Sequence, residues 1–188
     1  NSIANGDIYG GQSLNGKTNN NIIYIDSSEV AGRIFGGNSW QNKADNNTVI
    51  IKNNTKASRV YGGYSESGDV NKNTVIISNN TDNPINRVAG GYSKNSTVSY
   101  NNVFIDNSSV VDVYAGRSDN SAASYNTVNI NESTVTGNIY GGFSNGNGIT
   151  SNNKVILSGN SIVTNANIYG GYSNGEIKDN TLTLDGWS

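Results

Sequence analysis

The stretch Ile8-Tyr9-Gly10-Gly11 is the first of seven related tetrapeptides in this chain of 188 residues. The other six read Ile34-Phe35-Gly36-Gly37, Val60-Tyr61-Gly62-Gly63, Val88-Ala89-Gly90-Gly91, Val113-Tyr114-Ala115-Gly116, Ile139-Tyr140-Gly141-Gly142 and Ile168-Tyr169-Gly170-Gly171. Their first residues lie 26, 26, 28, 25, 26 and 29 residues apart. A period of this length is typical of a repeat architecture. We therefore interpret residues 1–188 as a single array, with repeats that start near 8, 34, 60, 88, 113, 139 and 168.

A second motif, Asn-x-aliphatic-x-aliphatic, keeps step with the first. It occupies residues 21–25, 47–51, 73–77, 101–105, 126–130, 153–157 and 180–184. Alternation with period two predicts strands, and the Gly, Asn and Ser residues between them predict turns. A looser third element precedes the tetrapeptides, as in Ser28-Glu29-Val30, Ser109-Val110-Val111 and Ser133-Thr134-Val135. The pattern predicts an all-β fold, a right-handed parallel β-helix (β-solenoid) of about seven coils with a period of about 26 residues.

The composition fits a fold in which the backbone and stacked polar residues contribute much of the stability. Only 34% of the residues are hydrophobic and 14% are charged, whereas 36 are Asn and 23 are Gly. Stacked coils would place Asn47 between Asn21 and Asn73, where the amides can bond to one another. A serine follows each tetrapeptide at 13, 39, 65, 93, 118, 144 and 173, and we interpret this constant position as structural. The paired glycines would bend the backbone, adopt positive φ or permit close packing, and Ala115 marks the coil where the first glycine matters least.

Several classes of function are disfavoured by the composition. The net charge is −2, and clustered Lys and Arg of the kind that bind nucleic acid are missing. The chain has no Cys, His or Met, so the sequence predicts no metal site, no cofactor and no imidazole or thiol catalysis. No run approaches the roughly 20 apolar residues that cross a bilayer, so we expect no membrane insertion by this segment. The N-terminal sequence lacks a signal-peptide pattern, and we expect a piece of a longer protein.

Aromatic residues supply the candidate ligand contacts. Six tetrapeptides carry Tyr or Phe at the second position, and we interpret this column as a stacked ladder in the core or at its edge. A more variable column follows the glycines and reads Gln12, Asn38, Tyr64, Tyr92, Arg117, Phe143 and Tyr172. Its variation suggests a position that faces water. We take Tyr64, Tyr92, Tyr172 and Trp40 as candidate contacts for a glycan or protein, against the alternative that they are isolated surface aromatics.

The middle position of the second motif raises a separate question. It reads Tyr24, Ile50, Ile76, Phe104, Asn129, Ile156 and Thr183, and it is mostly apolar although the alternation points it outward. A continuous exposed apolar stripe usually marks an interface. Either solenoids associate along the stripe formed by Tyr24, Ile50, Ile76 and Phe104, or the span between the Ser and the Asn of the same coil covers it.

Two other functions are compatible with a β-solenoid. A polysaccharide-degrading enzyme needs paired carboxylates, but Asp26, Asp106 and Asp185 follow the second motif only in scattered coils. An ice-binding solenoid needs a regular Thr array. The relevant column is interrupted at several coils and reads Ile22, Thr48, Thr74, Asn102, Thr127, Lys154 and Thr181. We therefore expect no enzyme and no catalytic residues, and keep both functions as alternatives.

The repeats at 168–173, Ile-Tyr-Gly-Gly-Tyr-Ser, and at 73–77, Asn-Thr-Val-Ile-Ile, resemble those in passenger regions of bacterial type V autotransporters. The resemblance covers almost the whole chain. It implies a β-helix at the bacterial cell surface or outside the cell, attached to the outer membrane through a part of the parent protein that this sequence lacks. It also implies a non-enzymatic adhesin or a rigid stalk, whose partner is a host or bacterial surface protein or glycan.

Overall fold

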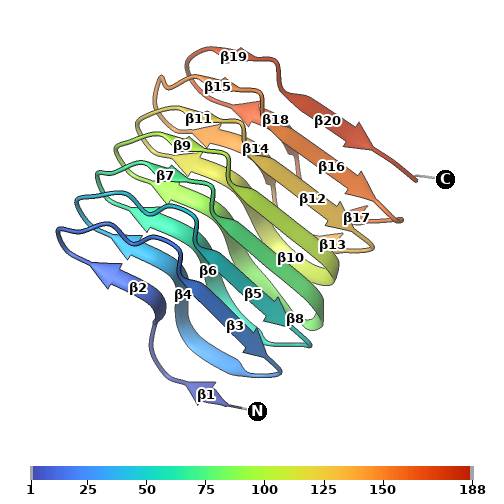
Figure 1. Cartoon of the computed structure of the whole chain (residues 1–188). Helices are drawn as coiled ribbons and strands as arrows, with labels where there is room; N and C mark the ends of the chain where they lie inside the picture. The colour runs from blue at the N-terminus through green and yellow to red at the C-terminus, as the bar shows by residue number, and fades with distance from the viewer. Residues whose placement is uncertain (1, 187–188) are drawn as a thin grey trace.

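The computed structural model describes residues 2–186, which form strands and turns and contain no helix. The chain winds into stacked coils, and neighbouring coils pair through parallel strands. Figure 1 shows the coils following one another from the N-terminus to the C-terminus, with equivalent strands side by side. The prediction of an all-β solenoid of about seven coils is confirmed.

The second motif forms one side of the solenoid, which we call the Asn-motif face. Its strands are β3 (Ile22–Asp26), β5 (Thr48–Lys52), the first parts of β8 (Thr74–Ser93) and β10 (Asn102–Ser118), β12 (Thr127–Asn131), β16 (Lys154–Ser158) and β20 (Thr181–Leu184). Equivalent positions pair in register, as Val49 does with Val75. Inward and outward side chains alternate along each strand, which explains the period-two pattern.

The tetrapeptides form a second side, the aromatic face. Its strands are β2 (Ile8–Ser13), β4 (Glu29–Ser39), β6 (Lys56–Ser65), the last parts of β8 and β10, β14 (Ile139–Ser144) and β18 (Ile168–Tyr172). The repeat starts predicted at 8, 34, 60, 88, 113, 139 and 168 pair in an unbroken series. The predicted third element also pairs between coils, in β1 (Ile3–Ala4), the starts of β4 and β6, β13 (Thr134–Val135) and β17 (Ile162–Val163).

A further set of short strands lies in the span between each Ser and the next Asn, where the sequence predicted none. They are β7 (Val70–Asn71), β9 (Val98–Ser99), β11 (Ala123–Ser124), β15 (Thr150–Ser151) and β19 (Ile177–Lys178). Val70 and Val98 are fully buried and pack with Ala44 in a small cluster of their own. These spans therefore close the coil as a separate side, which we call the short-strand face.

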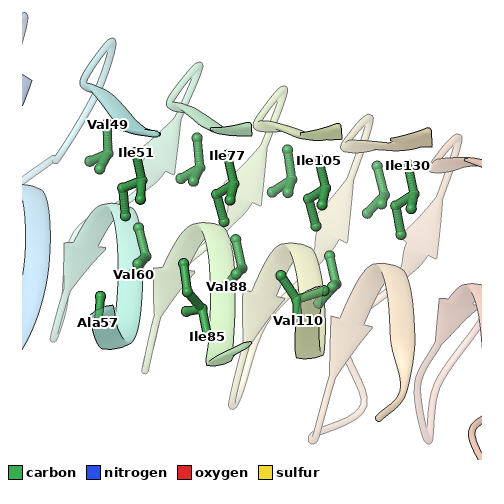
Figure 2. Packing of buried hydrophobic residues seen from close by; sticks show 14 of the residues in the cluster. Val49, Ile51, Ala57, Val60, Ile77, Ile85, Val88, Ile105, Val110 and Ile130 are labelled. Atoms are coloured by element: carbon green, nitrogen blue, oxygen red, sulfur yellow. The ribbon is translucent and has the colours of Figure 1, made fainter. Parts of the chain in front are cut away.

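The main core lies between the faces and repeats in every coil. Figure 2 shows Val49, Ile51, Ile77, Ile105 and Ile130 in one row, opposite a row that contains Val60 and Val88. Ala57, Ile85 and Val110, from the third element, complete the second row. All ten are buried. Each buried aliphatic side chain contributes about 1.5–3 kcal/mol relative to an exposed one, so stacking identical positions gives a modest but continuous apolar core.

An asparagine ladder runs beside this core. The backbone N–H and the Nδ2 group of Asn47 both donate to Asn73 Oδ1, each at 2.9 Å, and Nδ2 also donates to the Thr18 carbonyl at 2.8 Å. The same contact to the next coil recurs at every rung from Asn21 to Asn180. Because these amides bond to one another and to backbone carbonyls, Asn47 and Asn73 can be fully buried at little cost.

The glycines of the tetrapeptides allow close approach and do not supply positive φ. Within residues 2–186, Gly159 and Gly186 are the glycines with positive φ, and neither belongs to a tetrapeptide. A Cβ on Gly37 would lie 2.5 Å from Asn47 Nδ2, and one on Gly62 would collide with the Gly90 carbonyl oxygen. Of the three reasons that the sequence suggested for these glycines, close packing is the one that the structure supports.

The constant serines, which we interpreted as structural, form a ladder at a corner of the coil. Ser65 Oγ accepts a hydrogen bond from the Gly68 N–H at 2.8 Å and donates to the Asn42 carbonyl of the preceding coil at 2.8 Å. Ser39, Ser93 and Ser118 make equivalent pairs of bonds. In these four coils the serine thus links its own turn to the turn of the neighbouring coil, which is a structural role.

Left-handed backbone occurs instead directly before each ladder asparagine. Seven residues at this corner have φ between 55° and 61°: Asn20, Asn46, Lys72, Tyr100, Tyr125, Asn152 and Asp179. Asn and Asp adopt this conformation more readily than other non-glycine residues, which accounts for four of the seven. Tyr100 and Tyr125 depart from that preference in two adjacent coils.

Candidate ligand-contact surfaces

The tyrosines of the tetrapeptides stack on the outer side of the aromatic face. Neighbouring rings of Tyr114 and Tyr140 lie 4.8 Å apart at 8°, and those of Phe35 and Tyr61 lie 5.0 Å apart at 10°. These four rings are buried, although they point away from the aliphatic core and form a cluster separate from it. The predicted aromatic ladder is confirmed, and it is a second core.

The column after the glycines covers this ladder. The Tyr64 ring packs edge-on against Tyr61 at 6.2 Å and 67°, and against Tyr92 at 5.2 Å and 73°. The Tyr64 hydroxyl donates to Glu66 Oε1 at 2.5 Å, and the Tyr92 hydroxyl donates to Asp119 Oδ2 at 2.6 Å. Burial, and then these bonds to carboxylates, raise the pKa of both phenols. Both side chains are therefore half-buried and hydrogen-bonded.

Ala89 interrupts the ladder, and an arginine fills the interruption. The Tyr92 ring lies 6.1 Å from Tyr61, across the position where a ring is missing. The Arg117 guanidinium carbon lies 4.9 Å from the centre of the Tyr92 ring and 5.4 Å from that of Tyr114. Cation–π contacts of this kind contribute about 0.5–1 kcal/mol at exposed sites and more when desolvated. Arg117 and Tyr92, from the column after the glycines, thus supply contacts in place of the ring that is missing at Ala89.

Trp40 and Tyr172 are the more exposed of the four predicted contacts. Trp40 has 50% of its surface exposed and sits one coil from the exposed Leu14, while Tyr172 is 37% exposed and stacks on Phe143 at 5.2 Å. The two lie five coils apart, or about 24 Å at a strand spacing of about 4.8 Å. The structure brings Tyr64 and Tyr92 together, but it does not gather all four residues into one site. Their role in binding stays a prediction.

An exposed aromatic pair escaped the sequence analysis. Tyr100 and Tyr125 lie at the corner between the short-strand face and the Asn-motif face, with ring centres 5.0 Å apart and planes within 10°. They are 52% and 48% exposed. The available signal was their position: each directly precedes a ladder asparagine, where the other coils carry Asn, Asp or Lys.

The apolar stripe on the Asn-motif face is open to solvent. Tyr24 and Phe104 are 58% and 39% exposed, and Ile50 and Ile76 are partly exposed. The spans between Ser and Asn form the short-strand face, so the hypothesis that they cover this stripe is wrong. Self-association along Tyr24, Ile50, Ile76 and Phe104 stays a prediction.

The acidic residues after the second motif are spread along the solenoid. Asp26 pairs in register with Lys52, Lys52 with Ser78, and Ser78 with Asp106. Asp26 and Asp106 are therefore three coils, or about 14 Å, apart. Paired carboxylates of glycosidases lie within roughly 10 Å of each other. Among residues 2–186, no three Asp, Glu, His or Cys side chains gather in a group that could hold a metal ion.

Comparisons with known proteins identify no related protein. The sequence matches no protein-family model, no curated protein and no solved structure. Nothing in residues 2–186 forms a helix of the length and apolarity needed to span a membrane.

Proposed function

We propose that this chain is a rigid, non-enzymatic β-solenoid module of a bacterial surface or secreted protein, which acts as an adhesin or as the stalk of one. The single observation that carries the proposal is the unbroken asparagine ladder from Asn21 to Asn180. With the serine corners and the stacked rings, it ties each coil to its neighbours. The result is a stiff rod of about 30 Å, on which side chains of successive coils are held at fixed spacing.

The outer faces support a role in recognition. Exposed aromatic side chains offer broad, rigid contact area with a polar edge, which suits glycan and protein surfaces. Trp40, Tyr172, Tyr100 and Tyr125 provide such area at separate places along the rod. The resemblance of the repeats to autotransporter passengers supports display at the bacterial cell surface or release from it.

Binding of the purified chain to intact epithelial cells, bacterial cells and a glycan array tests this proposal. We expect saturable binding that a Trp40→Ala, Tyr172→Ala double variant weakens, because these are the two most exposed of the four predicted contacts. Tyr172 also packs against Phe143, Tyr140 and Tyr169, so the melting temperature of this variant is measured beside its binding. A Tyr64→Ala, Tyr92→Ala variant is the comparison. Since both rings pack on the aromatic ladder, it should also lose thermal stability, by about 2 kcal/mol or more per ring.

The outcomes separate an adhesin from a stalk. Binding by the folded wild type makes the segment an adhesin. A folded, monodisperse protein that binds nothing, but whose coils remain cooperative and stiff in single-molecule stretching, makes it a stalk. A chain that turns over a polysaccharide would contradict the proposal.

A further inference from the structure

We propose that coils four and five carry a binding site for a neutral saccharide, built around Tyr100 and Tyr125. This inference rests on the proposed role in surface recognition and assigns a place and a ligand class to it. It starts from a comparison of each coil with its neighbours in the same chain.

The corner before the ladder asparagine has the same left-handed backbone in every coil, so its residues can be compared directly. Tyr100 and Tyr125 both have φ of 60°, a conformation that is strained for a bulky side chain. Asn fits this corner better and occupies it in three of the other coils. Strained residues that persist side by side are expected where they serve a function.

The fold itself makes little use of these two side chains. No hydrogen bond within residues 2–186 involves either hydroxyl, and about half of each side chain faces solvent. The two rings stack on each other. This contrasts with Tyr64 and Tyr92, whose hydroxyls bond to carboxylates and whose rings cover the buried ladder.

The strands that follow the pair extend the surface. Asn102 lies beside Thr127, and Phe104 lies beside Asn129, in the register of β10 and β12. These residues alternate outward with the tyrosines, so two rows of three side chains form one patch. The Asn102, Thr127 and Asn129 side chains make no hydrogen bond within the described part of the chain. Beside Phe104 and Asn129, a shallow hollow of about 180 Å³ extends to Asp106 and Asn131.

The chemistry of the patch favours a neutral saccharide. Tyr100, Tyr125 and Phe104 offer aromatic carbon, and the amides and hydroxyls between them can both donate and accept hydrogen bonds, as sugar hydroxyls require. None of the six residues carries a charge, and the two charged residues that flank them, Lys72 and Asp106, have opposite signs. Two strands, each about 4.8 Å wide and presenting about 13 Å of length, cover a surface of about 125 Å². A stable protein interface takes about 800 Å² from each partner, so the patch suits a small ligand.

The test is a double variant, Tyr100→Asn with Tyr125→Asn, which introduces the residue that Asn20, Asn46 and Asn152 already provide at this corner. The control is Lys72→Asn, which places Asn at the same corner of the coil next to Tyr100 and leaves both rings in place. Probes are neutral cello-, chito- and manno-oligosaccharides, with sialylated and sulfated glycans as charged comparisons. We expect the wild type and Lys72→Asn to bind one neutral series equally, and the double variant to bind at least about tenfold more weakly with its melting temperature retained.

Each other outcome overturns the inference. Unchanged affinity in the double variant would place the contact elsewhere. Preference for the charged glycans, or no saccharide binding at all, would exclude the ligand class. If the wild type still binds cells in either case, the proposed function stands while this site falls, so the two failures can be told apart.

Discussion

Replacing Asn73 by Ala removes one rung from the middle of the asparagine ladder. The side chain donates to the Ala44 carbonyl at 2.8 Å and to Asn101 Oδ1 at 2.9 Å, and its Oδ1 accepts from the backbone N–H of Asn47 at 2.9 Å. Truncation leaves the Ala44 carbonyl and the Asn47 N–H buried without partners. Each such group costs about 1–3 kcal/mol, so we expect the free energy of unfolding to fall by about 2–6 kcal/mol.

The control is Asn21→Ala, at the first rung of the same ladder. The Asn21 side chain donates to Asn47 Oδ1 at 2.8 Å, but no described group donates to its own oxygen. We therefore expect a loss within about 1 kcal/mol. Urea unfolding followed by far-ultraviolet circular dichroism measures both variants. If Asn73→Ala costs no more than Asn21→Ala, the ladder does not stabilise the solenoid in the way argued above.

Two further predictions concern the glycines and the response to acid. Gly62→Val should lower the free energy of unfolding by about 1–3 kcal/mol, because its Cβ would collide with the Gly90 carbonyl oxygen. Gly6→Val is the control and should be nearly neutral, because a Cβ at Gly6 would have no neighbouring atom within 4 Å. Equal melting temperatures for the two variants would contradict the packing argument. The hydrogen bond from Arg33 lowers the pKa of Asp7 in the folded protein. The Asp7 carboxylate therefore stabilises the fold at pH values above its unfolded pKa of about 3.9, and this stabilisation is lost as the pH falls through the folded pKa. Melting temperature should therefore depend less on pH below about 5 in Asp7→Asn, and identical acid profiles would refute the assignment.

The sequence predicted the repeats because their signals are local and occur seven times. Register, the Asn-motif strands and the polar ladders all follow from the constant spacing of Asn47, Asn73 and their equivalents. The short-strand face was missed because segments such as Val70–Asn71 and Ala123–Ser124 are too short to show an alternation. The sequence also left the role of the tetrapeptide glycines undecided. The close approach of Gly37 to Asn47 depends on the distance between two sides of the solenoid, which the sequence alone does not show.

The surfaces were harder to predict than the fold. Tyr64 and Tyr92 vary between coils as surface residues do, yet their half-burial depends on how the rings settle around Ala89 and Arg117. The pair Tyr100 and Tyr125 gave no pattern of its own, because tyrosine does not signal left-handed backbone. Their position directly before a ladder asparagine was visible in the sequence, but the left-handed backbone and the exposure of the two rings come from the structure.

The asparagine ladder also has a direction, and this bears on how the chain folds. From Asn21 to Asn153 the backbone N–H and one hydrogen of the amide nitrogen donate to the asparagine of the following coil. From Asn47 to Asn180 the side-chain oxygen accepts from the preceding one. A coil completes its rung only when its successor is in place, so each new coil is templated by the edge already formed. Folding should then advance as a growing front. A middle coil that fails to form would leave two shorter fronts, each with an open edge exposed to other chains.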